Sequence, residues 1–231
     1  MLADYDEFKR RADAVRSRIG EACALAGRRP EDVELLAVTK SQPALAAEFA
    51  ARYGLRAVGE NRVQEAVEKR AQTAVAVAWE LIGHLQSNKA RLAVLHFDRI
   101  QSADSPRLLE ILDREAGAIG KTMPVLLQVN AGLDPAKSGV EPDEAPRLLA
   151  AATKLKSLRV DGLMTIAPLS GGVDAARRAF ALLRELRDRL SADAGAPLRE
   201  LSMGMSSDMD AAVAEGSTIV RVGTALFGER A

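Results

Sequence analysis

Short apolar runs alternate with helix-length amphipathic segments along this chain, and this alternation is the feature that most limits its fold. Eight runs are candidate strands, at residues 33–38, 56–58, 79–82, 97–100, 125–129, 160–164, 199–202 and 218–222. Segments long enough for a crossover helix lie between them, at residues 43–53, 62–72, 105–118, 142–154, 174–190 and 209–216. Eight strand-helix repeats favour an α/β fold, a closed (β/α)8 TIM barrel that takes residues 1–231 as a single domain.

The first and last segments of the chain affect the count of outer helices. Between Asp4 and Gly27 apolar residues recur at three- and four-residue steps, which predicts an additional N-terminal helix that Gly27 ends. After the last strand only residues 223–231 remain, too few for a full eighth outer helix, so we expect the opening helix to cover that gap. An open doubly wound sheet is the alternative. Its glycine-rich phosphate turn is missing after the first strand, where the sequence reads AVTKSQP.

The charge balance and the residue counts exclude several classes of function. The 32 Lys and Arg residues offset 32 Asp and Glu residues, so neither a nucleic-acid nor a membrane surface is expected. No segment approaches the ~18 apolar residues of a membrane span, and the charged start MLADYDEFKR is unlike a secretion signal, which predicts a cytoplasmic protein. The single cysteine, Cys23, can form no internal disulfide, and with two histidines, His84 and His96, no metal site is expected.

Lys40 is the first candidate for chemistry, because it follows the first strand at the end that leads into a helix. That end forms the functional rim of a barrel. A lysine there can point inward, where partial desolvation favours the neutral amine and Schiff-base formation. The alternative is a lysine whose stem lies on the barrel wall while its amine stays in water.

The segment 202–208, SMGMSSD, and the segment 221–224, RVGT, are the second candidate. In barrels the loops after strands seven and eight form the recurring phosphate site. Ser206 and Ser207 precede a predicted helix, and Gly223 would let the backbone approach an anion while Thr224 adds a hydroxyl. The alternative reading is a helix cap without a ligand.

Polar residues also follow other strands, which suggests a lined pocket. They are Asn61 after the second strand, His84 after the third, Asn130 after the fifth and Thr165 after the sixth. A lone histidine such as His84 is more often a hydrogen-bonded structural residue than a base. Asn88 and Lys89 are explained equally well as the start of a helix.

Seven segments, in this order, resemble the pyridoxal 5′-phosphate (PLP) homeostasis proteins, the YggS/PROSC family: LLAVTK, GENRVQE, WELIGHLQSNK, VN with KSG beyond it, GLMTIAP, LSMGMSSDM and GSTIVRVGTALFG. The resemblance covers nearly the whole chain and implies a barrel similar to the N-terminal domain of alanine racemase. It implies that the cofactor PLP is held as an internal aldimine on Lys40. Further implied roles are phosphate binding by Ser206, Gly223 and Thr224, a contact of Arg221 with the pyridine nitrogen, and lining of the ring pocket by Asn61.

The chain departs from the family pattern at a few positions. Gln42 stands where family members often carry a second lysine, which could assist exchange of the aldehyde on Lys40. Glu80 replaces a frequent histidine, and residues 131–132, Ala-Gly, replace a usual Ile-Ser pair. Lys137 in the KSG segment is retained and is the remaining candidate for assisting exchange, although a solvated loop lysine is the alternative reading.

The resemblance implies a carrier with no catalytic residues, which holds PLP for intracellular vitamin B6 homeostasis and supplies apo-enzymes in transient contacts. A PLP-dependent amino-acid racemase is the second hypothesis. It needs an opposing tyrosine base on a second domain, whereas the two tyrosines here, Tyr5 and Tyr53, stand at no strand end. A Schiff-base aldolase acting on a phosphosugar is the third, and such a protein would be colourless. A monomer is expected rather than a dimer.

Overall fold

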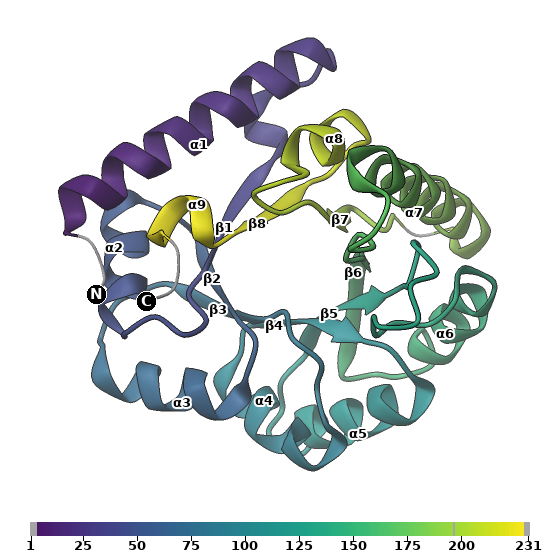
Figure 1. The fold of residues 1–231 in the computed structure, drawn as a ribbon. Helices are drawn as coiled ribbons and strands as arrows, with labels where there is room; N and C mark the ends of the chain where they lie inside the picture. Colours follow the sequence, from purple (N-terminus) through teal and green to yellow (C-terminus); the bar gives the residue numbers. More distant parts are fainter. Residues whose placement is uncertain (1–3, 196, 229–231) are drawn as a thin grey trace.

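The computed structural model describes residues 4–195 and 197–228. Within these residues eight parallel strands follow one another around a closed barrel (Figure 1). They are β1 (Glu34–Val38), β2 (Ala57–Glu60), β3 (Ala78–Leu81), β4 (Arg99–Ala103), β5 (Met123–Gln128), β6 (Leu158–Met164), β7 (Glu200–Ser202) and β8 (Ile219–Val222). β1 pairs with both β2 and β8, so that Ala37 lies opposite Val58 on one side and Val222 on the other. This closure confirms the predicted barrel and excludes the open sheet.

Each predicted strand overlaps one observed strand, and the largest difference is at β4. This strand spans Arg99–Ala103, where the sequence predicts residues 97–100. Phe97 is fully buried, and its N–H donates to Ala93 O at the end of a helix. Phe97 therefore ends that helix and packs in the core instead of starting the strand.

Helices surround the barrel and cover its outer face (Figure 1). They are α1 (Tyr5–Leu25), α2 (Leu45–Tyr53), α3 (Val63–Gln72), α4 (Ala90–His96), α5 (Pro106–Gly117), α6 (Ala145–Ala152), α7 (Gly172–Ala194), α8 (Met209–Ala214) and α9 (Thr224–Phe227), with 3-10 turns η1 (Pro30–Asp32), η2 (Ser87–Lys89) and η3 (Pro142–Glu144). The sequence predicts all of these α-helices except α4 and α9, which are too short to show helical periodicity. In the described part of the chain, no helix has the length and apolar character to cross a membrane.

The N-terminal helix α1 occupies the gap that a full eighth outer helix would fill. Its Phe8 ring stacks on Phe227 of α9, with 5.3 Å between the ring centroids, and also packs against Phe49 of α2 at 5.8 Å. On its other side Arg18 forms an ion pair with Asp210 of α8, at 2.7 Å. α1 thus lies between α2 and α8, as expected from the sequence (Figure 1).

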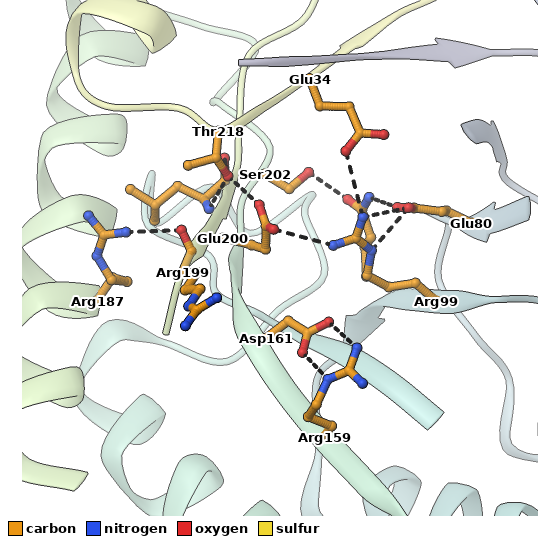
Figure 2. A network of polar contacts seen from close by, with 12 residues as sticks. Glu34, Glu80, Arg99, Arg159, Asp161, Arg187, Arg199, Glu200, Ser202 and Thr218 are labelled. Carbon is orange, nitrogen blue, oxygen red and sulfur yellow. Dashed lines mark hydrogen bonds and ion pairs between the residues drawn. The ribbon is translucent and has the colours of Figure 1, made fainter. Parts of the chain in front are cut away.

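The barrel interior is apolar in its middle and charged at the end where the strands begin. Apolar side chains from five strands, with one from the residue after β3, form the middle: Leu36, Val38, Ala57, Ile82, Leu126, Met164 and Ile219. At the charged end, Arg99 binds Glu80 at 2.6 Å and lies 3.8 Å from Glu200 and 4.0 Å from Glu34 (Figure 2). The opposite end, where the strands terminate, holds the candidate site.

Candidate functional site

A cavity of about 450 Å³ opens at the ends of the strands, bounded by the segments that follow β1, β2, β3, β6, β7 and β8. All six residues that the sequence predicts for cofactor binding line it: Lys40, Asn61, Ser206, Arg221, Gly223 and Thr224. Their positions are thus brought together as expected, while the role of each stays a prediction. The apolar part of the lining includes Val38, Ile82 and Ile166, which suit the faces of a planar ring.

The alternation of β1 places Lys40 in this cavity. Leu36 and Val38 belong to the apolar cluster inside the barrel, whereas Leu35 and Ala37 pack outward in the core between barrel and helices. Lys40 keeps the same spacing two residues beyond the end of the strand. Its half-buried side chain consequently lines the cavity beside Val38.

Arg221 of β8 is the buried cation of the site, with 4% of its surface exposed. Its Nη1 donates to Ser202 Oγ and its Nη2 to the Thr165 carbonyl, both at 2.7 Å. Burial lowers the pKa of Arg221 to about 10, against the opposing influence of Asp208. Because that value is far above neutrality, the guanidinium stays charged, and among the described residues no carboxylate lies within ion-pair distance of it. The cavity therefore presents positive charge that an anionic ligand would balance.

The predicted phosphate end consists of the loop before α8 and the turn before α9. Ser206 and Thr224 carry hydroxyls at the cavity surface. Gly223 has an ordinary φ of −116°, and a Cβ added there would meet Val38 no closer than 3.4 Å. Neither the backbone nor the packing requires glycine at this position, so its missing side chain serves mainly to keep the cavity open.

The capping alternative for the serines is not what the structure shows. Asp208 is the N-cap residue of α8 and makes no side-chain capping bond to it. Its Oδ1 instead accepts the N–H of Met205, and the Ser206 carbonyl accepts Arg18 from α1. These contacts shape the loop and leave the Ser206 side chain at the cavity surface.

The other polar strand-end residues serve the scaffold. Asn130 donates to the Asp134 carbonyl and accepts the Asp134 N–H, which holds the loop after β5. Thr165 Oγ1 donates to Val129 O in the neighbouring strand. His84 Nδ1 lies 3.3 Å from Asp104, and the histidine of this pair is exposed while the aspartate is mostly buried. Each of these side chains is explained by its local contacts.

Two of the departures noted in the sequence now have positions. Gln42 lines the cavity in place of a second lysine. Lys137 lies in the loop after β5, its N–H bonded to the Asp134 carbonyl, and it is absent from the described cavity lining. A part for Lys137 in exchange therefore finds no support in the geometry.

Sequence reasoning missed the polar chain that holds Arg221 from behind. Ser202 Oγ donates to Gln101 Oε1, and Gln101 Nε2 donates to Glu80 Oε2. Glu80 also accepts Arg99, as Figure 2 shows. The available signal was a polar residue at inward-facing positions of three strands, which an apolar interior would not contain.

Comparison with known proteins places this site in a family. The family model described as "Alanine racemase, N-terminal domain" matches residues 11–231. A pyridoxal phosphate homeostasis protein of Pseudomonas aeruginosa is 44% identical over 94% of this chain and 93% of its own length. A crystal structure of an unknown protein from Bifidobacterium adolescentis is 39% identical, with a TM-score of 0.91 and 98% of both chains covered.

A third relative was solved with a ligand. This is the structure of PipY of Synechococcus elongatus with PLP bound, at 45% identity and a TM-score of 0.81, covering 91% of this chain and 100% of that one. Both the family model and the identity over nearly the full length are decisive. The chain belongs to the pyridoxal phosphate homeostasis proteins, a family built on the N-terminal domain of alanine racemase.

Proposed function

We propose that this protein binds PLP in the cavity, holds it covalently through Nζ of Lys40 and serves as a carrier in vitamin B6 homeostasis. One observation carries the proposal. An inward-pointing lysine shares a cavity with a buried arginine that has no carboxylate at ion-pair distance among the described residues. An anionic ligand that offers an aldehyde to the lysine and a hydrogen-bond acceptor to the arginine suits both residues, and the relative solved with PLP supports that choice.

The chemistry of the lining fits this cofactor. When bound, PLP supplies an electrophilic aldehyde on an electron-withdrawing ring. Lys40 offers the amine, the hydroxyls of Ser206 and Thr224 suit the phosphate, and Gly223 leaves room for it. Asn61 and Ile82 also line the cavity and are available to the ring.

Arg221 agrees with storage of the cofactor but does not by itself separate a carrier from a racemase of the same barrel type. A guanidinium only donates hydrogen bonds, so it binds an unprotonated ring nitrogen and repels a protonated one. The pKa of about 10 leaves Arg221 charged at neutral pH. A neutral ring withdraws electrons weakly, which suppresses chemistry at the α-carbon of a bound amino acid.

The lining also favours a carrier without catalytic residues over a racemase. Among the described cavity residues there is no tyrosine, histidine or carboxylate to act as a second base. Tyr5 packs on Phe49 beneath Arg52, outside the barrel. The Tyr53 hydroxyl donates to Asp13, and burial together with that bond raises its pKa to about 12.

The test is the visible absorption of the purified protein before and after borohydride. We expect a yellow protein that borohydride bleaches, with the pyridoxyl label on the Lys40 peptide. Lys40→Ala should lose the label and keep its unfolding temperature, and Lys137→Ala should keep the label. A colourless protein that cleaves a phosphosugar would replace the proposal by an aldolase, and a label confined to Lys137 would also overturn it.

Transfer of the cofactor to PLP-dependent apo-enzymes, by a monomer in transient contacts, is part of the same proposal. Mixing the loaded protein with an apo-enzyme should restore that enzyme's activity. Equilibrium sedimentation of the loaded protein should give a mass near the 24.7 kDa of one chain. A stable dimer would contradict the proposed monomer and leave the proposed transfer of the cofactor intact.

A further inference from the structure

Three charged residues form a buried cluster directly behind the turn that carries Lys40. Glu60 ends β2, while Glu65 and Lys69 lie one turn apart on α3. Lys69 is 6% exposed, and its Nζ lies 2.7 Å from Glu60 Oε1 and 2.7 Å from Glu65 Oε1. We call these three residues the clamp.

The clamp binds the backbone on both sides of Lys40. Lys69 Nζ donates to the Thr39 carbonyl at 2.6 Å, and Thr39 Oγ1 donates to Glu60 Oε1 at 2.6 Å. On the far side, the N–H of Ser41 donates to Glu65 Oε1. The residues immediately before and after Lys40 are thus bonded to the clamp.

Ser41 shows that this turn is held against its local preference. Its φ is 60°, in the left-handed region that a residue with a side chain seldom adopts. Such a conformation persists where the surroundings over-determine it, and it clusters at functional sites. Two bonds hold the turn in this conformation: the Gln42 N–H donates to the Thr39 carbonyl within it, and the Ser41 N–H donates to Glu65 on α3.

The cluster is costly for a purely structural device. A lysine and two carboxylates lose much of their hydration here, and an ion pair that replaces apolar packing contributes little net stability. Burial would raise the pKa of the Glu65 carboxyl, but the bonds from Lys69 and from the Ser41 N–H outweigh it and lower that pKa. The ionised form of Glu65 is therefore the one engaged with the turn.

We infer that Glu60, Glu65 and Lys69 are positioning residues for Lys40, which hold its turn so that the amine is preorganised for covalent attachment of the cofactor. This inference rests on the proposed function. It also gives separate roles to Asn61 and to the charged residues on either side of it in the sequence. Asn61 lines the cavity, while the clamp contacts the Lys40 turn from behind the cavity. Preorganisation of this kind speeds a covalent step without touching the reacting ligand.

The experiment compares variants of Glu65, because Lys69→Met would leave the buried Glu60 carboxylate without its cation and would weaken the whole barrel. Glu65 is only partly buried on the surface of α3. Glu65→Leu removes the acceptor for the Ser41 N–H, Glu65→Gln retains an oxygen acceptor, and Glu68→Leu is a matched control at an exposed position of the same helix. PLP is added to the stripped full-length protein, and the growth of the visible band gives the attachment rate.

We expect Glu65→Leu to slow attachment by about tenfold or more, the equivalent of one lost charge-assisted hydrogen bond. Glu65→Gln and Glu68→Leu should stay within about twofold of the wild-type rate. Should Glu65→Leu fail to fold, Glu65→Asp, which withdraws the carboxylate by one methylene, must show the same slowing. An attachment rate equal to that of the wild type in the Glu65→Leu or Glu65→Asp variant would overturn this inference and leave the proposed function standing. A wild-type protein that gives no label on Lys40 would overturn the proposed function itself.

Discussion

At the scale of single residues, the orientation of Arg221 follows from the hydrogen-bond chain behind it. A carboxylate only accepts, so Gln101 must turn its NH2 toward Glu80 and its carbonyl toward Ser202. Ser202 then donates to Gln101, which leaves its lone pairs for the Arg221 guanidinium. The hydrogen bonds thus have a single consistent direction, and they hold the Arg221 guanidinium by Nη1 on Ser202 and by Nη2 on the Thr165 carbonyl.

The proposed phosphate site gives the first prediction. Ser206→Ala or Thr224→Val should weaken PLP binding by about 1 to 3 kcal/mol each, because each removes a hydrogen bond to a charged group. Titration of the stripped protein with PLP measures the effect, and titration with unphosphorylated pyridoxal is the control, which should hardly change. Equal weakening of both ligands would mean that these hydroxyls contact the ring instead.

Sequence reasoning located the site residues better than it located their partners. Lys40 and Arg221 were singled out because each lies at the end of a predicted strand, and the family resemblance then suggested their roles. The clamp and the partners of Arg221 were not found, since the spacing between Ser202 and Gln101 along the chain carries no sign that they touch. Contacts of that kind depend on how individual side chains meet in the folded barrel, and the order of the elements along the chain does not give this.

At the scale of elements, α1 is an outer helix supplied from the opposite end of the chain. Its buried face includes Phe8, which contacts the rings of Phe49, Tyr53 and Phe227. Helix α1 therefore packs against both α2 and α9, and the three helices form one layer. Since α9 begins at Thr224, loosening α1 should also reach the phosphate end of the cavity.

The second prediction tests that layer. Phe8→Ala should lower the free energy of unfolding by about 3 to 5 kcal/mol, the range for truncating a fully buried aromatic side chain. Urea unfolding measures it. Leu25→Ala, at a position of the same helix that is 92% exposed, is the control and should change stability by less than about 0.5 kcal/mol. Similar small losses in both variants would show that α1 does not contribute to the barrel's core.

The charged end of the barrel gives the third prediction. Three carboxylates surround Arg99 there (Figure 2). Burial, and then repulsion from Glu80, raise the pKa of Glu34 despite the attraction of Arg99. When the pKa of a group is higher in the folded than in the unfolded protein, its contribution to stability is fully present at pH values below the pKa of the unfolded state. That contribution is lost as the pH rises through the pKa of the folded state. Ionised Glu34 therefore weakens the fold at neutral pH.

Glu34→Gln should accordingly stabilise the protein at pH 7.5, by up to about 1 kcal/mol, while the difference from wild type vanishes near pH 4. Unfolding in urea at the two pH values measures this difference. Glu31→Gln, at an exposed neighbouring position, should show no such dependence. A Glu34→Gln variant that is less stable than wild type at pH 7.5 would mean that attraction to Arg99 outweighs the cost of burial.

At the scale of the whole molecule, barrel closure depends on close backbone approaches. A Cβ added at Gly162 of β6 would lie 2.0 Å from the Glu200 carbonyl of β7, so only glycine allows these strands to pair there. Gly83 likewise lies against the backbone of Asn61, at 2.2 Å from its carbonyl for an added Cβ. The sequence count of eight repeats predicted the closed barrel, while these contact points became visible only with the strands in place.

The last prediction separates carriage from racemisation, and it follows from the arrangement of the whole cavity. Lys40 enters from β1 and the Arg221 guanidinium is held by β6 and β7, while the described lining offers no second base opposite the lysine. Removal of an α-proton on one face and its return on the other needs such a base. We therefore expect negligible exchange of the α-proton with solvent deuterium when the loaded protein is incubated with several amino acids, as followed by proton NMR. An alanine racemase run in parallel is the positive control. Exchange by the wild-type protein at an enzymatic rate, on the order of 1 per second or faster, would establish it as a racemase and overturn the carrier.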